Sequence, residues 1–254
     1  MGLYKESRTG GRSFGYYNAD HLTDWMYTNG PIGRLINLLL TTNYSRLINN
    51  EPLHIIGLGA GIGTYEIGIS YSIARHTTHL PKLTLVDLNH DLLDASQEKN
   101  TALSASLIKA DLRHPPITRN SFDMAFFHNV GHFYTVPDRT NILIKVKDFL
   151  NQKGLIFWLE QSLWRPISAF INPYPKPDRL EYLTCNDTTP ECIYAVSKDG
   201  GTPYRLINRP QMAKIAQDVG LDTLESGYSQ GETDKNPRRL VWSILQKNSI
   251  IHKL

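Results

Sequence analysis

The chain has 254 residues, of which 41% are hydrophobic and 20% charged, with a formal net charge of +3 at pH 7. This length and composition allow one enzyme-sized core, and no block of like charges suggests a polyanionic partner. The longest aliphatic run, residues 35–40, is too short to span a membrane, and the N-terminus lacks the apolar core of a secretion signal. The two cysteines show no CxxC spacing, which fits a reducing compartment better than a disulfide or a metal pair. We therefore expect a cytoplasmic protein with no membrane association.

Residues 1–50 are expected to form an N-terminal helical cap on a domain of residues 51–254. Residues 1–20 show no hydrophobic periodicity. A proline then opens a segment with apolar residues at the 3-4 spacing of an amphipathic helix: Ile32, Leu35, Ile36, Leu39 and Leu40. One face of this helix should pack on the main domain.

Residues 53–70, LHIIGLGAGIGTYEIGIS, begin as an apolar run, break into alternate glycines and resume at helical spacing. This pattern predicts a strand, a tight turn and a helix, with glycine where the backbone turns sharply and a ligand approaches. The glycines at 59, 61 and 63 give G-x-G-x-G, and no frame supplies G-x-G-x-x-G or the lysine of a P-loop. An ordinary glycine-rich turn is the alternative.

The rest of the chain alternates between expected strands and helices. Short apolar runs predict strands at residues 83–87, 106–111, 122–127 and 155–160, with a helix at 139–150. This alternation predicts a parallel sheet buried on both faces. Residues 161–209 are proline-rich without a sustained period and are interpreted as a lid-like insertion. A helix from Pro210 to Gly220 and two antiparallel strands, starting at Leu221 and Arg239, should close the chain.

Four features in order, the glycine turn, Asp87 after the second strand, Asp111 after the third and FDMAFFHNVGHF at the fourth, resemble the class I S-adenosylmethionine-dependent methyltransferases. The resemblance implies an α/β fold with a seven-stranded Rossmann-like sheet whose last strand is antiparallel. Helices would cover both faces, and the insertion would follow strand 5. S-adenosylmethionine would lie across the carboxyl ends of the first strands.

The resemblance also implies which residues hold the cofactor. Asp87 would accept both ribose hydroxyls, and Asp111 would accept from the adenine amino group while Leu112 packs on the ring. The alternatives are a helix-capping role for Asp87 and a turn role for Asp111. The other predicted cofactor contacts are Tyr17, Gly57, Leu58, Gly59, Gly61, Leu88, His128 and Asn129.

One position departs from the family pattern. Members of the family usually carry Asp or Glu where this chain has Gly57. That acid helps to hold the ammonium of the cofactor's methionine moiety. Tyr17, Asn129 or a backbone carbonyl are the substitutes that the sequence suggests.

The residues after the fourth strand would lie below the transferable methyl group. Because imidazole titrates near neutrality, His132 is the predicted general base, with His128 and Glu160 as further catalytic candidates. Either histidine is alternatively a structural residue. Two histidines without a third ligand do not define a metal site, and we expect no metal.

Aromatic residues are predicted to shape the acceptor pocket. The predicted substrate contacts are Trp25, His132, Phe133, Tyr134, Trp164 and Tyr174. Aromatic residues of this kind alternatively serve only packing. The segment INPYP at residues 171–175 is similar to the N-P-P-Y loop of nucleic-acid amino-methyltransferases, but it lies outside the fourth-strand position and lacks the second proline.

We therefore predict an enzyme that transfers a methyl group from S-adenosylmethionine to an oxygen or nitrogen of a small-molecule acceptor. We expect no nucleic-acid partner, and the sequence allows a homodimer. The alternatives are a methyltransferase for protein or nucleic acid and a cofactor-binding module without catalysis.

Overall fold

The structure is a computed structural model that describes residues 30–77, 79–89, 91, 105–161, 180–184, 193–197, 204–228 and 240–247. Four residues named in the sequence analysis lie outside these ranges: Tyr17, Trp25, Trp164 and Tyr174. Both cysteines also lie outside them.

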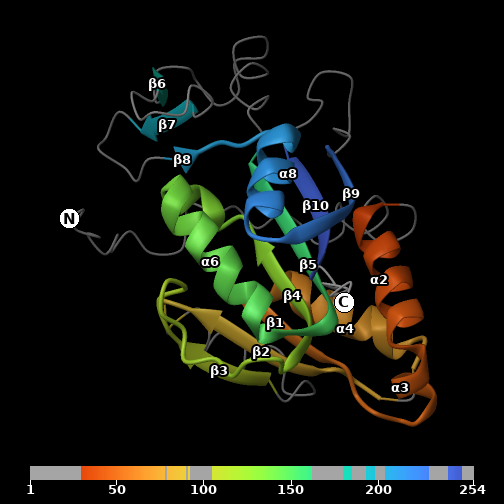
Figure 1. The fold of residues 1–254 in the computed structure, drawn as a ribbon. Coiled ribbons are helices and arrows are strands. Elements are labelled where there is room, and N and C mark those ends of the chain that lie inside the picture. Colours follow the sequence, from red (N-terminus) through yellow and green to blue (C-terminus); the bar gives the residue numbers. More distant parts are fainter. Residues whose placement is uncertain are drawn as a thin grey trace.

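A seven-stranded sheet forms the centre of the molecule in the order β3-β2-β1-β4-β5-β10-β9 (Figure 1). The first five of these strands pair in parallel, whereas β10 is antiparallel to both β5 and β9. This topology confirms the predicted sheet with its antiparallel last strand. The strands are β1 (His54–Leu58), β2 (Lys82–Asp87), β3 (Ala105–Lys109), β4 (Phe122–His128), β5 (Leu150–Gln161), β9 (Leu221–Tyr228) and β10 (Leu240–Lys247).

Helices cover both faces of the sheet, which is why its central strands are apolar on both sides. Every residue of β4 is buried. Helices α2 (Pro31–Thr42) and α4 (Thr64–Ala74) contribute to one core, and α6 (Val136–Phe149) and α8 (Arg209–Asp218) to the other. Two shorter elements, α3 (Tyr44–Ile48) and the 3-10 turn η2 (Gly131–Phe133), complete the described helices.

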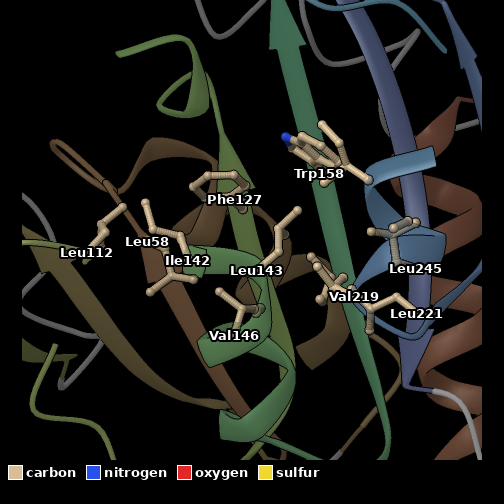
Figure 2. Packing of buried hydrophobic residues seen from close by; sticks show 14 of the residues in the cluster. Leu58, Leu112, Phe127, Ile142, Leu143, Val146, Trp158, Val219, Leu221 and Leu245 are labelled. Carbon is tan, nitrogen blue, oxygen red and sulfur yellow. The ribbon is translucent and has the colours of Figure 1, made fainter. Parts of the chain in front are cut away.

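The apolar residues of α6 recur at helical spacing, and the face that they form is buried against the sheet. Ile142, Leu143 and Val146 of α6 are buried in one cluster with Leu58 and Phe127. Figure 2 shows these side chains between the helix and the sheet. Burying one such aliphatic or aromatic side chain contributes about 1.5–3 kcal/mol, so this face anchors β1 and β4 together.

Helix boundaries follow local capping rules. The α6 helix begins three residues earlier than predicted, because Thr135 caps it and Pro137 is tolerated in the first turn. Asn208 and Gln211 form a capping box on α8, and Gly220, with φ +71°, follows its end. The predicted helix at Pro31 is confirmed, with its apolar stripe buried.

The insertion contains strands that the sequence analysis missed. Strands β6 (Leu180–Thr184), β7 (Ile193–Ser197) and β8 (Tyr204–Arg205) form a separate antiparallel sheet of three strands. They are short and separated by proline-containing segments, so no period extends far enough in the sequence to reveal them. In the described part of the chain, every helix is too short or too polar to cross a membrane.

Asp123 joins several elements at the amino-terminal edge of the parallel strands. Its side chain is 2% exposed and pairs with Arg46 of α3. It also accepts from the backbone amide of His54 at 2.9 Å and from the side-chain amide of Asn151 at 2.8 Å. This carboxylate therefore fixes α3, β1, β4 and β5 at the edge opposite the candidate site.

Candidate functional site

The turn after β1 adopts the conformation that its glycines allow. Gly59, Gly61 and Gly63 have φ values of +68°, +56° and +69°, which side chains rarely tolerate. A Cβ on Gly59 would lie 2.5 Å from Val130 Cγ2, whereas a Cβ on Gly61 would meet nothing within 4 Å. The turn is therefore closed on the Val130 side and open at Gly61, where a ligand has room to approach.

Asp87, at the end of β2, holds this turn. Its Oδ2 accepts from the amide of Gly61 at 2.8 Å, and its Oδ1 accepts from the amide of Asn89 at 2.8 Å. A carboxylate offers about four acceptor positions, so two hydrogen bonds leave capacity for a ligand's hydroxyl groups. Leu88, beside it, is 50% exposed. The ribose role of Asp87 and the cofactor contact of Leu88 stay predictions that this geometry accommodates.

Asp111 follows β3 and is engaged by a residue that the sequence analysis missed. Arg113 binds its carboxylate through Nε at 3.0 Å and through Nη2 at 2.6 Å, and the Arg113 amide adds a contact at 2.9 Å. The hydrogen bond from the Arg113 guanidinium holds the pKa of Asp111 below its usual value. Leu112 is buried in the core that contains Leu58 (Figure 2). The predicted adenine contact of Asp111 therefore competes with an ion pair, and that of Leu112 competes with core packing.

His128, the last residue of β4, forms a buried pair with Glu66 of α4. His128 Nε2 lies 3.1 Å from Glu66 Oε1, and Glu66 is fully buried. The ring of Tyr65 packs on the imidazole with centroids 4.5 Å apart. The sequence analysis missed Glu66, because nothing in a helical period shows that an acid in the first turn will reach a strand 62 residues away.

Glu160, at the end of β5, holds the turn that contains His132. Its carboxylate accepts from the amide of Gly131 at 2.7 Å, the amide of His132 at 3.2 Å and the Trp158 indole at 3.2 Å. Oε2 also lies 3.3 Å from His132 Nδ1. His132 and Glu160 are both fully buried. The catalytic role of Glu160 stays a prediction, and in the structure the oxygens of this buried carboxylate are directed at the turn.

Buried Arg139 completes the same turn. Its Nε and Nη2 both donate to the carbonyl of Gly131, at 3.1 and 2.9 Å. A Cβ on Gly131 would overlap the Glu160 carboxylate, so only glycine fits between these two charged groups. The sequence analysis did not single out Arg139, which appeared only as the start of a helix.

The remaining residues after β4 occupy distinct environments. Asn129 has φ +50°, and its amide donates to the carbonyl of Leu159 at 2.7 Å. The ring of Phe133 lies against His132 with centroids 4.1 Å apart. Tyr134 is buried within the core on the α6 side. Core packing therefore explains the presence of this aromatic residue just as well as the predicted substrate contact does.

The two acid–histidine pairs lie on opposite faces of the sheet at its carboxyl edge. His128 contacts Phe126, a member of the core beneath α2 and α4, while Glu160 contacts Trp158, a member of the core beneath α6. The glycine turn and Asp87 lie at the carboxyl ends of the neighbouring β1 and β2. In open α/β sheets, ligands bind at this edge. The structure therefore brings the predicted cofactor and catalytic residues of β1, β2, β4 and β5 to one edge.

Comparison with known families matches the central part of the chain. Residues 55–154 match the family described as Methyltransferase domain, a range that begins in β1 and ends in β5. A search of curated proteins found no significant match.

Solved structures share the fold across most of the chain. A protein from Pyrococcus horikoshii is similar over 93% of this chain and 100% of its own, with 11% identity and a TM-score of 0.58. An S-adenosylmethionine-dependent methyltransferase from Clostridium acetobutylicum is similar over 91% of this chain and 97% of its own, with 13% identity and a TM-score of 0.57.

A third structure contains ligands. It is the 1,6-didemethyltoxoflavin-N1-methyltransferase of Burkholderia thailandensis with bound 1,6-didemethyltoxoflavin and S-adenosylhomocysteine. It is similar over 91% of this chain and 86% of its own, with 10% identity and a TM-score of 0.55. At such identities these likenesses establish the fold.

Proposed function

We propose that the protein is a class I S-adenosylmethionine-dependent methyltransferase, whose catalytic domain includes the matched residues 55–154, and that it methylates an oxygen or nitrogen atom of a small molecule. The observation that carries the proposal is the juxtaposition at the carboxyl edge of the sheet. The open glycine turn follows β1 and is held by Asp87 of β2, and β1 neighbours β4, which leads into the turn of the buried His132–Glu160 pair.

The described residues fit the cofactor by their donor and acceptor chemistry. Asp87 offers carboxylate oxygens to ribose hydroxyls beside Gly61, where a side chain is absent and space is open. The N-terminus of α4, which follows the turn, favours a carboxylate by about 0.3–1 kcal/mol. When bound, S-adenosylmethionine supplies an electrophilic methyl group to the lone pair of an acceptor.

His132 is the proposed general base. An oxygen or nitrogen acceptor that loses a proton gains about 10²- to 10⁴-fold in rate from a positioned base. Glu160 Oε2, at 3.3 Å from Nδ1, holds the imidazole in one orientation and stabilises the imidazolium that forms when the ring takes a proton. Arg139 and Glu160 together fix the backbone of Gly131, so the base sits on a rigid turn.

A small-molecule acceptor is supported by two observations. The charged residues of the chain are spread without a basic block of the kind that tracks a nucleic acid. The Burkholderia enzyme with the same fold has 1,6-didemethyltoxoflavin and S-adenosylhomocysteine bound in its crystal structure. Residues 161–209 are the proposed lid over this acceptor, with Trp164 and Tyr174 as proposed contacts.

Two measurements test the proposal. Calorimetry should show saturable binding of S-adenosylmethionine and S-adenosylhomocysteine to the purified protein, and the absence of binding would refute the cofactor. A labelled-methyl assay on cell extract, separated by size after reaction, should place the label in the small-molecule fraction. Label in protein or nucleic acid would support a macromolecular acceptor, and tight binding without turnover would support a non-catalytic module.

A further inference from the structure

Gly57 and Glu66 share one small volume at the carboxyl end of β1. A Cβ on Gly57 would lie 2.5 Å from Glu66 Oε1 and 2.7 Å from Glu66 Cγ, closer than side chains approach one another. Residue 57 can therefore carry no side chain while the Glu66 carboxylate occupies this position. The glycine is the condition that lets an acid from helix α4 reach the strand.

The Glu66 carboxylate is fully buried and only one of its oxygens is used. Oε1 contacts His128 Nε2 at 3.1 Å. Oε2 has no hydrogen-bond partner among the residues that the structure describes. A buried carboxylate oxygen without a donor is costly, so the site is suited to a further donor group.

The imidazole points to the same ligand chemistry. A carboxylate only accepts, so Nε2 of His128 carries the proton and Nδ1 holds a lone pair. Nδ1 is also buried and lacks a hydrogen-bond partner in the described part of the chain. The pair thus presents two unused acceptors and a negative charge, which select a cationic donor over an anion.

The position of Glu66 narrows the class of cation. Glu66 lies in the first turn of α4, directly after the glycine turn, and that helix N-terminus favours an anionic group on a ligand. Consider a ligand that carries a carboxylate and an ammonium on the same carbon. If its carboxylate lies at this helix N-terminus, its ammonium lies on the side of the turn where the Glu66 carboxylate is. The methionine moiety of the proposed cofactor has this arrangement.

We propose that Glu66, oriented by His128, receives the ammonium of the cofactor's methionine moiety and so supplies from helix α4 the carboxylate that residue 57 lacks. This inference rests on the proposed function, since it takes S-adenosylmethionine as the ligand. Glu66 is a binding residue in this assignment, and His128 is a positioning residue.

The first test separates the ammonium from the rest of the ligand. Binding of S-adenosylhomocysteine is compared by calorimetry with binding of its deaminated analogue, which keeps the sulfur and carboxylate but lacks the ammonium. In Glu66→Gln, affinity for S-adenosylhomocysteine should fall at least tenfold, whereas affinity for the deaminated analogue should change less than threefold. Glu51→Gln, a half-exposed glutamate before β1, is the matched control and should leave both affinities unchanged.

The second test moves the carboxylate. Glu66→Ala should lose affinity for S-adenosylhomocysteine, and Gly57→Asp in the Glu66→Ala background should recover at least part of it, because the space at residue 57 is then open. Gly57→Asp alone should unfold at lower temperature than the wild-type protein, since the new side chain meets Glu66. A double variant with no more affinity than Glu66→Ala would contradict the inference.

The outcomes are distinguishable. Wild-type protein that binds neither ligand refutes the proposed function and this inference with it. Thermal unfolding first establishes that Glu66→Gln is folded. Wild-type binding that folded Glu66→Gln leaves unchanged, or weakens equally for both ligands, refutes only the role of Glu66 toward the ammonium. If Glu66→Gln does not fold, the double variant decides the inference.

Discussion

The Asp87 carboxylate accepts a hydrogen bond from the backbone amide of Gly61 at 2.8 Å, so the end of β2 fixes the turn that follows β1. A second hydrogen bond, from Asn89, holds the other oxygen. The residue proposed for ribose binding is therefore also a structural support of the glycine turn. Substitutions of Asp87 should affect both roles. The two roles can be separated by comparing a variant that keeps an acceptor oxygen with one that has none.

Asp87→Ala should weaken S-adenosylhomocysteine binding by more than tenfold, because an acceptor for two hydroxyl groups and a support of the turn are both lost. Asp87→Asn keeps one oxygen as an acceptor and should lose less. Calorimetry on both variants measures the difference, with thermal unfolding as the folding control. Affinity unchanged in Asp87→Ala would remove the ribose assignment.

Alanine at Gly59 and at Gly61 should have different effects. Both positions have positive φ, which costs a non-glycine residue about 1–2 kcal/mol. At Gly59 the new methyl group also meets Val130, so Gly59→Ala should lower unfolding stability more. At Gly61 it points into open space on the ligand side, so Gly61→Ala should lower cofactor affinity more than stability. Urea unfolding and calorimetry on the two variants test this crossover, and equal effects would contradict it.

His132→Gln should slow methyl transfer by about 10²- to 10⁴-fold if the imidazole takes a proton from the acceptor. Cofactor affinity should stay within a few-fold of wild type, because His132 contacts Glu160 and Phe133 instead of the glycine turn. His76→Gln, at an exposed histidine, is the matched control. A His132→Gln enzyme with the wild-type rate would refute the base.

Asp123→Asn should destabilise the protein by about 1.5–3 kcal/mol, because a buried charged acceptor of three donors is replaced by a neutral amide. Asp148→Asn is the control, since its pair with Arg119 is largely exposed and should contribute less than about 1 kcal/mol. Urea unfolding measures both. Cofactor affinity of folded Asp123→Asn should be unchanged, because Asp123 lies at the opposite edge of the sheet from the site.

The Asp111–Arg113 pair should contribute a pH-dependent stability. The Arg113 guanidinium lowers the pKa of Asp111 below 3.8 in the folded chain, so the unfolded chain takes up a proton first as the pH falls. The contribution is present above about pH 4 and is lost as the pH drops through the folded pKa. It should stay below about 1 kcal/mol, because the side chains are 29% and 41% exposed.

The variant Arg113→Gln tests the direction of this pH dependence of stability. The pKa of Asp111 should rise toward its usual value in an NMR titration, and the stability difference from wild type should shrink at acid pH. Arg119→Gln, at a more exposed ion pair, is the control. A difference that grows toward acid pH would contradict the assignment.

Much of the fold could be predicted because its signals are local. The alternate glycines at 59, 61 and 63 allow positive φ wherever they occur in the chain, and all three have it. The apolar runs at β1, β2, β4 and β5 were found from a few residues each, and the stripe on α2 from its 3-4 spacing. The strand pattern then left few topologies for a sheet of this kind.

The site was only partly predictable. Sequence reasoning selected His128, His132 and Glu160 from their place at or after the ends of strands, but it did not show what the Glu160 carboxylate contacts. The carboxylate accepts from residues 131 and 132, which lie 29 and 28 positions away. Arg113, Arg139 and Glu66 were missed, because charged residues on a helix or after a strand show no sign in one sequence of whether they will be buried.

The sequence by itself determined the strands of the main sheet, the glycine turn and the acids at the end of β2 and after β3, because each depends on residues near one another in the chain. Only the tertiary structure decided that Glu66 fills the space left by Gly57, that Glu160 holds the His132 turn and that β6, β7 and β8 form a second sheet. The reason is physical. Burial and pairing between distant residues are set by how the helices pack on the sheet, and no local period records that packing.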